Sequence, residues 1–330
     1  YSGNSSTQAL TGLGFEPDLV WIKNRDGGAG SHDHYLFDQV RGTTKHIRSN
    51  GTNAEGTASG VTSFDSDGFT LGSSDGMNES SRTFASWNWK ANGQGSANSD
   101  GSITTTYTSA NTTSGVSIIT YTGNKTSGAT IGHGLGAVPK MIIGKRLDTT
   151  ASWGIYHSAL GATKYMDFNT SPASTSTAPW NDTEPTSSVI TLGNWDNVNA
   201  SGGSHVIYAF AEKKGFSKFG SYVGNGSTDG SFIWLGFRPA MVIIKLSSTG
   251  TENWRIFDNK RIGYNPSNYL LYPSGSFAED TTGSNIDFLS NGFKLKETNA
   301  GTNGSGNTYI YMAFASEPLV SSNDIPATAR

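Results

Sequence analysis

The chain has 330 residues, a net charge of −3 and 15% charged residues, against about 25% in a typical soluble protein. This charge offers no positive surface for duplex nucleic acid or for an anionic membrane, so we expect neither as a partner. Glycine, with 42 residues, is far more frequent than its usual ~7%. The composition therefore predicts a globular protein with many turns and few salt-bridged helices.

The chain contains no cysteine, which excludes disulfides, thiolate metal sites and cysteine nucleophiles. No apolar run approaches the roughly 20 residues that a membrane-spanning helix needs, and no signal segment opens the sequence. Because the sequence begins at Tyr1 without a methionine, we expect a fragment, a processed product, or a longer protein whose first part is not represented. No motif calls for a cofactor.

One pattern occurs three times along the chain. A Tyr-x-Gly-Asn element comes first. It is followed by a Leu-Gly-x-x-Pro element, whose proline lies 16 to 18 residues after the tyrosine and leads into an apolar stretch. That stretch ends in a lysine six residues after each proline. The three copies are marked by Tyr1, Pro17 and Lys23, by Tyr121, Pro139 and Lys145, and by Tyr222, Pro239 and Lys245. Several markers in one order indicate a true internal repeat.

The repeat predicts three tandem, homologous β-sandwich modules of about 100 residues each, with a jelly-roll-like character. Their predicted bounds are 1–93, 115–215 and 216–318. The insertion 94–114 is rich in Gly, Ser, Thr and Asn and is predicted to be a flexible linker. Residues 319–330 are predicted to be a C-terminal tail.

Short runs of β-branched and aromatic residues, separated by turn residues, indicate strands. In the middle module we predict strands at 115–122, 141–145, 154–157, 164–168, 189–192 and 206–211. No window keeps a helical apolar period, so the fold class is all-β. Strands 241–244 and 309–314 are apolar on both faces, which predicts that the modules pack against one another.

Two loop-like stretches of the middle module combine tryptophan with polar residues. Aromatic faces stack on the C–H surfaces of sugars, and Asn and Asp hydrogen-bond to hydroxyls. We therefore nominate Trp180, Asn181, Asp182, Asn194, Trp195 and Asp196 as exposed ligand contacts. The alternative is that these tryptophans belong to the core, as we expect for Trp21, Trp87 and Trp89.

No motif identifies a catalytic residue. Glu16, Asp18, Asp258, Glu279 and Asp287 are available as paired acids, but sequence spacing in a β-protein cannot place two of them across a cleft. Asp65-Ser66-Asp67-Gly68 opens like a calcium loop but lacks the later ligands. We expect a turn whose Asp side chains bind backbone, and no metal site.

Three segments also resemble a known family: Gly14–Lys23, Ser63–Phe69 and Trp87–Gly93. They are similar to tandem β-rich modules of unknown function in the virion and tail-fibre-like proteins of tailed bacteriophages, notably marine phages and cyanophages. The resemblance spans nearly the whole chain and assigns no site residue. It implies a virion protein, on the external surface or in a tail appendage.

Three functions follow as hypotheses. The first is a non-enzymatic adhesin, a tail-fibre or spike component whose loops bind a host-surface glycan or receptor. The second is a purely structural virion protein, such as a head decoration or fibre shaft. The third is a polysaccharide depolymerase, which needs acidic pairs along a groove. The expected partners are other virion proteins and copies of the same chain, as a homotrimer by analogy with phage fibres.

Overall fold

The computed structural model describes residues 1–26, 32–168, 178–282 and 285–316. Within these ranges the chain folds into antiparallel strands, with two helices of one turn each, α1 (Asp75–Asn78) and α2 (Asp196–Asn199). The predicted all-β fold is therefore confirmed. Neither helix approaches the length that crossing a membrane requires, and the described residues contain no other candidate.

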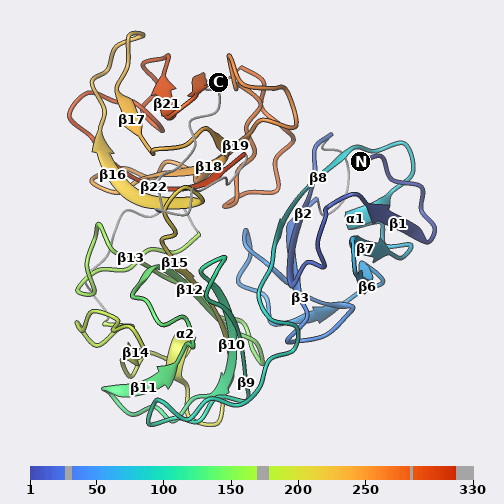
Figure 1. The fold of residues 1–330 in the computed structure, drawn as a ribbon, viewed down its shortest axis with the longest axis vertical. Helices are drawn as coiled ribbons and strands as arrows, with labels where there is room; N and C mark the ends of the chain where they lie inside the picture. The colour runs from blue at the N-terminus through green and yellow to red at the C-terminus, as the bar shows by residue number, and fades with distance from the viewer. Residues whose placement is uncertain (27–31, 169–177, 283–284, 317–330) are drawn as a thin grey trace.

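Strand pairing divides the chain into three groups, which form three lobes around a common centre (Figure 1). The first strand set, β1–β8, has a five-stranded sheet in the order β5-β4-β3-β2-β8 and a three-stranded sheet in the order β1-β7-β6. Its strands are β1 (Gln8–Thr11), β2 (Leu19–Asn24), β3 (His34–Asp38), β4 (Lys45–Arg48), β5 (Gly56–Thr57), β6 (Val61–Asp65), β7 (Gly68–Leu71) and β8 (Phe84–Trp89).

The second strand set, β9–β15, has a five-stranded sheet in the order β13-β12-β15-β10-β9 and a two-stranded sheet of β11 and β14. Its strands are β9 (Tyr107–Asn111), β10 (Val116–Thr122), β11 (Ala129–Gly132), β12 (Pro139–Arg146), β13 (Gly154–His157), β14 (Val189–Leu192) and β15 (Ser204–Ala211). The predicted strand at 164–168 is reduced to one bridge between Met166 and Ile155, and β11 was not predicted.

The third strand set, β16–β22, repeats this plan with the sheet orders β16-β22-β18-β19 and β17-β21-β20. Its strands are β16 (Ser217–Val223), β17 (Phe232–Trp234), β18 (Pro239–Leu246), β19 (Arg255–Asp258), β20 (Ile286–Leu289), β21 (Gly292–Leu295) and β22 (Thr308–Ala315). In each set an apolar cluster lies between the larger and the smaller sheet.

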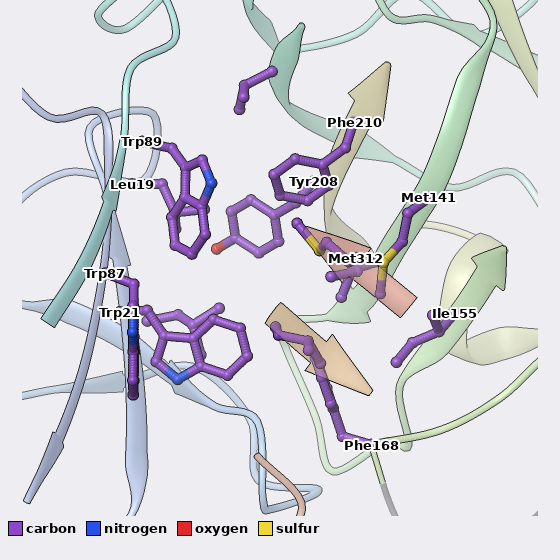
Figure 2. Packing of buried hydrophobic residues seen from close by; sticks show 14 of the residues in the cluster. Leu19, Trp21, Trp87, Trp89, Met141, Ile155, Phe168, Tyr208, Phe210 and Met312 are labelled. Atoms are coloured by element: carbon purple, nitrogen blue, oxygen red, sulfur yellow. The ribbon is translucent and has the colours of Figure 1, made fainter. Parts of the chain in front are cut away.

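A fourth apolar cluster, the central cluster, joins the three sets (Figure 2). In the view of Figure 2, Trp21, Trp87 and Trp89 of the first set face Tyr208 and Phe210 of the second. The buried members are Leu19, Trp21, Leu36, Val40, Ile47, Ala85, Trp87, Trp89, Ala91, Val116, Ile118, Met141, Ile143, Leu147, Trp153, Ile155, Met166, Phe168, Val206, Tyr208, Phe210, Phe219, Met241, Ile243, Trp254, Ile256, Leu271, Ile310, Met312 and Phe314.

The central cluster explains why some strands are apolar on both faces. Successive side chains of a strand point to opposite faces of its sheet. In β18, Val242 and Ile244 belong to the cluster inside the third set, whereas Met241 and Ile243 belong to the central cluster. Both faces are therefore buried, and packing of the larger sheets against one another accounts for the doubly apolar pattern.

Each residue of the Tyr-x-Gly-Asn element has a structural role. The hydroxyls of Tyr1, Tyr121 and Tyr222 donate to the backbone carbonyls of Met77, Val198 and Thr302. A Cβ on the element's glycine (Gly3, Gly123 or Gly224) would collide with a carbonyl oxygen. The backbone N–H of the element's asparagine (Asn4, Asn124 or Asn225) donates to a fully buried asparagine (Asn78, Asn199 or Asn303).

The repeated lysines are fully buried rather than exposed. Lys145 donates to the carbonyls of Arg146 and Ala151 at 3.0 and 2.8 Å, and to that of Thr52 in the first set at 3.2 Å. Lys23 and Lys245 likewise bind the carbonyls of Asn24 and Glu252. Burial lowers the pKa of each of the three lysines to about 8.

The segment 94–114 is not the flexible linker that its composition predicts. Its residues 107–111 form β9, which pairs with β10, and Ile103 bridges to Ile131. Thr105 and Ser109 are buried. The small polar residues are used because they bond to backbone at close range, as Ser109 Oγ does with the N–H of Asn92 at 2.8 Å. The predicted tail 319–330 lies outside the described residues.

Candidate functional site

The predicted contact Trp180 is a core residue. Its side chain is fully buried, and its ring lies edge-on to Tyr156 in the cluster inside the second set. Its nomination as an exposed ligand contact is therefore wrong. The polar sequence around it comes from the turn that follows, where Asn181 and Asp182 both adopt positive φ angles of 52° and 50°.

The other five nominated residues lie near one another at one end of the second set. Asn194, Asp182 and Asp196 are exposed, and Asn181 and Trp195 are half-buried. The loop before β11 connects the two segments, because Lys125 pairs with Asp196 at 2.5 Å and Ser127 donates to Asn181. Two of the nominated polar side chains, Asn181 and Asp196, are thus engaged within the protein.

The Trp195 side chain mainly packs against its neighbours and is only partly exposed to a ligand. Its ring centroid lies 4.9 Å from that of Tyr165. The same ring also approaches Gly154 so closely that a Cβ there would lie 3.2 Å from it. Trp195 therefore covers the edge of the core and leaves a partial aromatic surface beside Asn194.

Trp234 is the tryptophan that the structure exposes most. Of the eight tryptophans, six are buried and Trp195 is half-buried, whereas Trp234 is 58% exposed. It lies on β17, at the edge of the smaller sheet of the third set, and Phe232 on the same strand is 46% exposed. Ile233 between them points into the core.

A groove of about 370 Å³ runs beside Trp234. Its polar side chains include Glu212, Lys214, Lys218 and Asn291. The ammonium of Lys218 lies 4.1 Å from the centroid of the Trp234 ring, within range of a cation–π contact. An exposed aromatic face beside a carboxylate, an amide and two ammonium groups can stack on a sugar ring and hydrogen-bond to its hydroxyls.

Three of the acidic residues named from the sequence, Asp18, Asp258 and Glu279, are bound to other groups. Asp258 and Glu279 both pair with Arg261, at 2.6 and 2.7 Å, and Glu279 also pairs with Arg25 at 2.7 Å. Asp18 accepts the N–H groups of Ala91 and Gly93, and burial raises its pKa. Among these contacts, the Arg25–Glu279 pair joins the first set to the third.

The predicted Asp turn is confirmed in part, because Asp67 binds backbone whereas Asp65 binds a side-chain hydroxyl. Asp67 accepts the N–H groups of Gly12 and Gly14 at 3.0 and 2.6 Å, and Asp65 accepts the hydroxyl of Thr70 at 2.7 Å. The two carboxylates therefore bind different neighbours. In the part of the chain that the structure describes, no group of three or more His, Asp or Glu side chains is placed to hold a metal ion.

Comparison with known families gives one match, over residues 1–318, to the family described as Domain of unknown function (DUF7483). The chain belongs to this family. No curated protein and no solved structure matches the chain. The DUF7483 match covers residues of all three strand sets.

Sequence reasoning missed Trp234, although the repeat holds a signal for it. β17 pairs with β21, β11 with β14 and β1 with β7. When the three pairs are aligned by their registers, Trp234 corresponds to Gly132 and Thr11. Phe232 corresponds in the same way to Thr130 and Ala9. Two outward positions that are small or polar elsewhere in this DUF7483 chain are thus aromatic in the third set, which packing does not require.

Proposed function

We propose that the chain is a non-enzymatic binding protein of the adhesin type, whose ligand is a surface glycan held at Trp234. The observation that carries this proposal is the 58% exposure of Trp234 beside a groove with polar side chains. A buried indole contributes strongly to stability. Trp234 and Phe232 are instead exposed together beside a groove, which is a feature of ligand-binding surfaces.

The groove supplies both parts of a sugar site. The indole of Trp234 provides the apolar face, and Glu212 and Asn291 on the groove wall provide hydrogen-bond acceptors and donors. Lys218 and Lys214 add positive charge, which favours sugars that carry carboxylates or phosphates. The remaining nominated residues, around Asn194 and Trp195, form a second polar surface of the same chemistry.

The ion pairs of Asp258 and Glu279 support a binding role rather than a depolymerase activity. Glycoside hydrolysis needs one protonated carboxyl group and one free carboxylate across a cleft. Asp258 and Glu279 are both engaged in ion pairs with the guanidinium of Arg261. This pair is therefore suited to joining strands and poorly suited to general acid catalysis.

The virion setting rests on the sequence resemblance to phage proteins. A purely structural virion role stays the second candidate, and the central cluster favours it, because five tryptophans are used there for internal packing. Cryo-electron microscopy of particles separates the two. A few copies at the distal end of an appendage support the adhesin, and many symmetry-related copies on a head or shaft support the structural role.

The binding proposal is tested by Trp234→Ala in a glycan array and a whole-cell binding assay. We expect binding to fall at least tenfold while circular dichroism and the melting temperature stay unchanged. Phe277→Ala is the matched control, because Phe277 is 57% exposed at a different site and its loss should leave binding intact. Equal binding by the Trp234 variant and the unaltered chain would overturn the assignment.

A further inference from the structure

The larger sheet of the first set lacks a strand that the other two sets have. In the second set β15 lies between β12 and β10, and in the third set β22 lies between β18 and β16. The corresponding strand of the first set, β8, pairs with β2 and is the last strand of its sheet. Among the described residues, β8 therefore has one open edge.

The pairing registers show which residues form this edge. Tyr121 and Tyr222 lie opposite His205 and Tyr309, and the residues before them continue the ladder along β15 and β22. Tyr1 starts the same ladder on β8, because its nitrogen donates to Phe84 O at 3.0 Å and its carbonyl accepts from Phe84 N at 2.8 Å. Successive residues of an antiparallel strand direct their backbone N–H and C=O groups to opposite sides. After Phe84, the backbone groups of Ser86 and Asn88 are therefore the next ones that point to the open edge.

A cavity of about 420 Å³ lies along the open edge of β8. Trp87 and Trp89 line it from the first set, and Met241, Asp258 and Phe314 line it from the third. Figure 2 shows these two tryptophans reaching from the first set into the central cluster. The cavity therefore lies in an interface between strand sets.

The equivalent positions in the other sets are filled by apolar side chains. Three residues before the tyrosine, Ile118 of β10 and Phe219 of β16 both belong to the central cluster. Phe219 packs against His157 at 6.4 Å between ring centroids. The pairing of β13 with β12 and of β19 with β18 places His157 and Asp258 at equivalent positions of their sets. Asp258 lines the cavity. In the first set, the cavity thus lies at the position that Ile118 and Phe219 fill in the other two sets.

We propose that the open edge of β8 is the docking site of an extended segment joined to the nitrogen of Tyr1, which adds a strand antiparallel to β8 with an apolar residue three positions before Tyr1. Such a strand would pair with Ser86 and Asn88 and place that apolar side chain in the cavity. It would also turn the partly buried amino group of Tyr1, whose pKa burial lowers, into a neutral peptide nitrogen. The inference is independent of the proposed glycan site.

Three forms of the chain test this inference. One begins at Tyr1, and one carries Val-Ser-Ile-Ile-Thr, the sequence of Val116–Thr120, directly before Tyr1. The third carries Val-Ser-Asp-Ile-Thr, in which an acid replaces the residue aimed at the cavity. Hydrogen exchange is followed at the amides of Ser86 and Asn88, with Trp87, whose backbone faces β2, as the internal reference.

We expect the first extension to slow exchange at Ser86 and Asn88 at least tenfold and to raise the melting temperature. The Asp-containing extension should do neither. Unchanged exchange in the Ile-containing form would overturn the proposal, as would slow exchange already present in the form that begins at Tyr1. A dimer of that form in sedimentation, with protection that rises with concentration, would instead assign the edge to a second copy.

Discussion

The hydroxyl of Tyr208 donates a 2.7 Å hydrogen bond to the carboxylate of Asp38, which lies 170 residues away in another strand set. Two further contacts complete a ring. The indole of Trp87 donates to Asp258 at 3.1 Å, and the ring of His157 bonds to the carbonyl of Tyr311 at 3.1 Å. Each contact joins a different pair of strand sets, so specific polar bonds accompany the apolar packing at the centre.

Tyr208→Phe should lower the free energy of unfolding by about 1–2 kcal/mol, because it removes the buried hydrogen bonds that the hydroxyl donates to Asp38 and accepts from Arg41. Asp38 keeps its 2.6 Å ion pair with Arg41, which limits the loss. Denaturant unfolding measures the change, with Tyr264→Phe, at the surface, as the control. Identical stability of the two variants would show that the bond contributes nothing.

Asn199→Ala should cost about 2–4 kcal/mol of stability, since buried polar groups left without partners are expensive. The side chain of Asn199 donates to the carbonyls of Thr126 and Gly193 and accepts from the N–H of Asn124. Asn197→Ala, two residues away and half-exposed, is the matched control. A similar small effect in both variants would argue against the structural role of the buried asparagine.

The buried lysines predict a rise in stability with pH. Burial lowers the pKa of Lys23, Lys145 and Lys245 to about 8, whereas unfolded lysine titrates near 10.4. Between these values the unfolded chain binds more protons than the folded chain, so the free energy of unfolding increases with pH. The gain is complete above the unfolded pKa and is lost as the pH falls through 8.

Lys145→Met should remove about a third of that rise, on the order of 2–3 kcal/mol between pH 8 and 10. Unfolding in urea at several pH values measures it. Above pH 10 buried tyrosines such as Tyr121, whose pKa burial raises, oppose the trend. Lys125→Met, at an exposed ion pair, should leave the slope unchanged, and a flat profile in the unaltered chain would contradict the lysine assignment.

Gly136→Ala should destabilise the chain by about 1–2 kcal/mol through the backbone alone. Gly136 has a φ of 65°, and an added Cβ would meet no atom within 4 Å. Asn tolerates this conformation better than Ala, so Gly136→Asn should cost less. If the two variants melt at the same temperature, the left-handed conformation is not the cause of the glycine in the Leu-Gly-x-x-Pro element.

Trp195→Ala and Trp234→Ala should differ in stability. Trp195 packs on Tyr165 and against Gly154, so its removal should cost about 1–3 kcal/mol. Trp234→Ala should change stability by no more than about 0.5 kcal/mol, as surface substitutions usually do. Thermal unfolding compares them, and a larger loss at Trp234 would make it a packing residue.

The sequence by itself determined the all-β class and most strands of the second set, because alternation and turn residues are local signals. Strands predicted at 154–157 and 189–192 have the bounds of β13 and β14. The repeated Tyr-x-Gly-Asn and Leu-Gly-x-x-Pro elements were also visible, since each depends on a glycine. In the first a Cβ would collide with a carbonyl oxygen, and in the second the φ angle is positive. Their division of the chain into three homologous modules stays a prediction.

Only the tertiary structure decided which aromatic residues reach solvent. Trp180 and Trp234 both occur in short mixed stretches, yet one is buried beside Tyr156 and the other is on a sheet edge. The polar surroundings of Trp180 reflect a turn, which no local pattern distinguishes from an exposed loop. Likewise, the open edge of β8 and its cavity depend on how strands far apart in sequence pair and pack, because burial is a property of the assembled sheets.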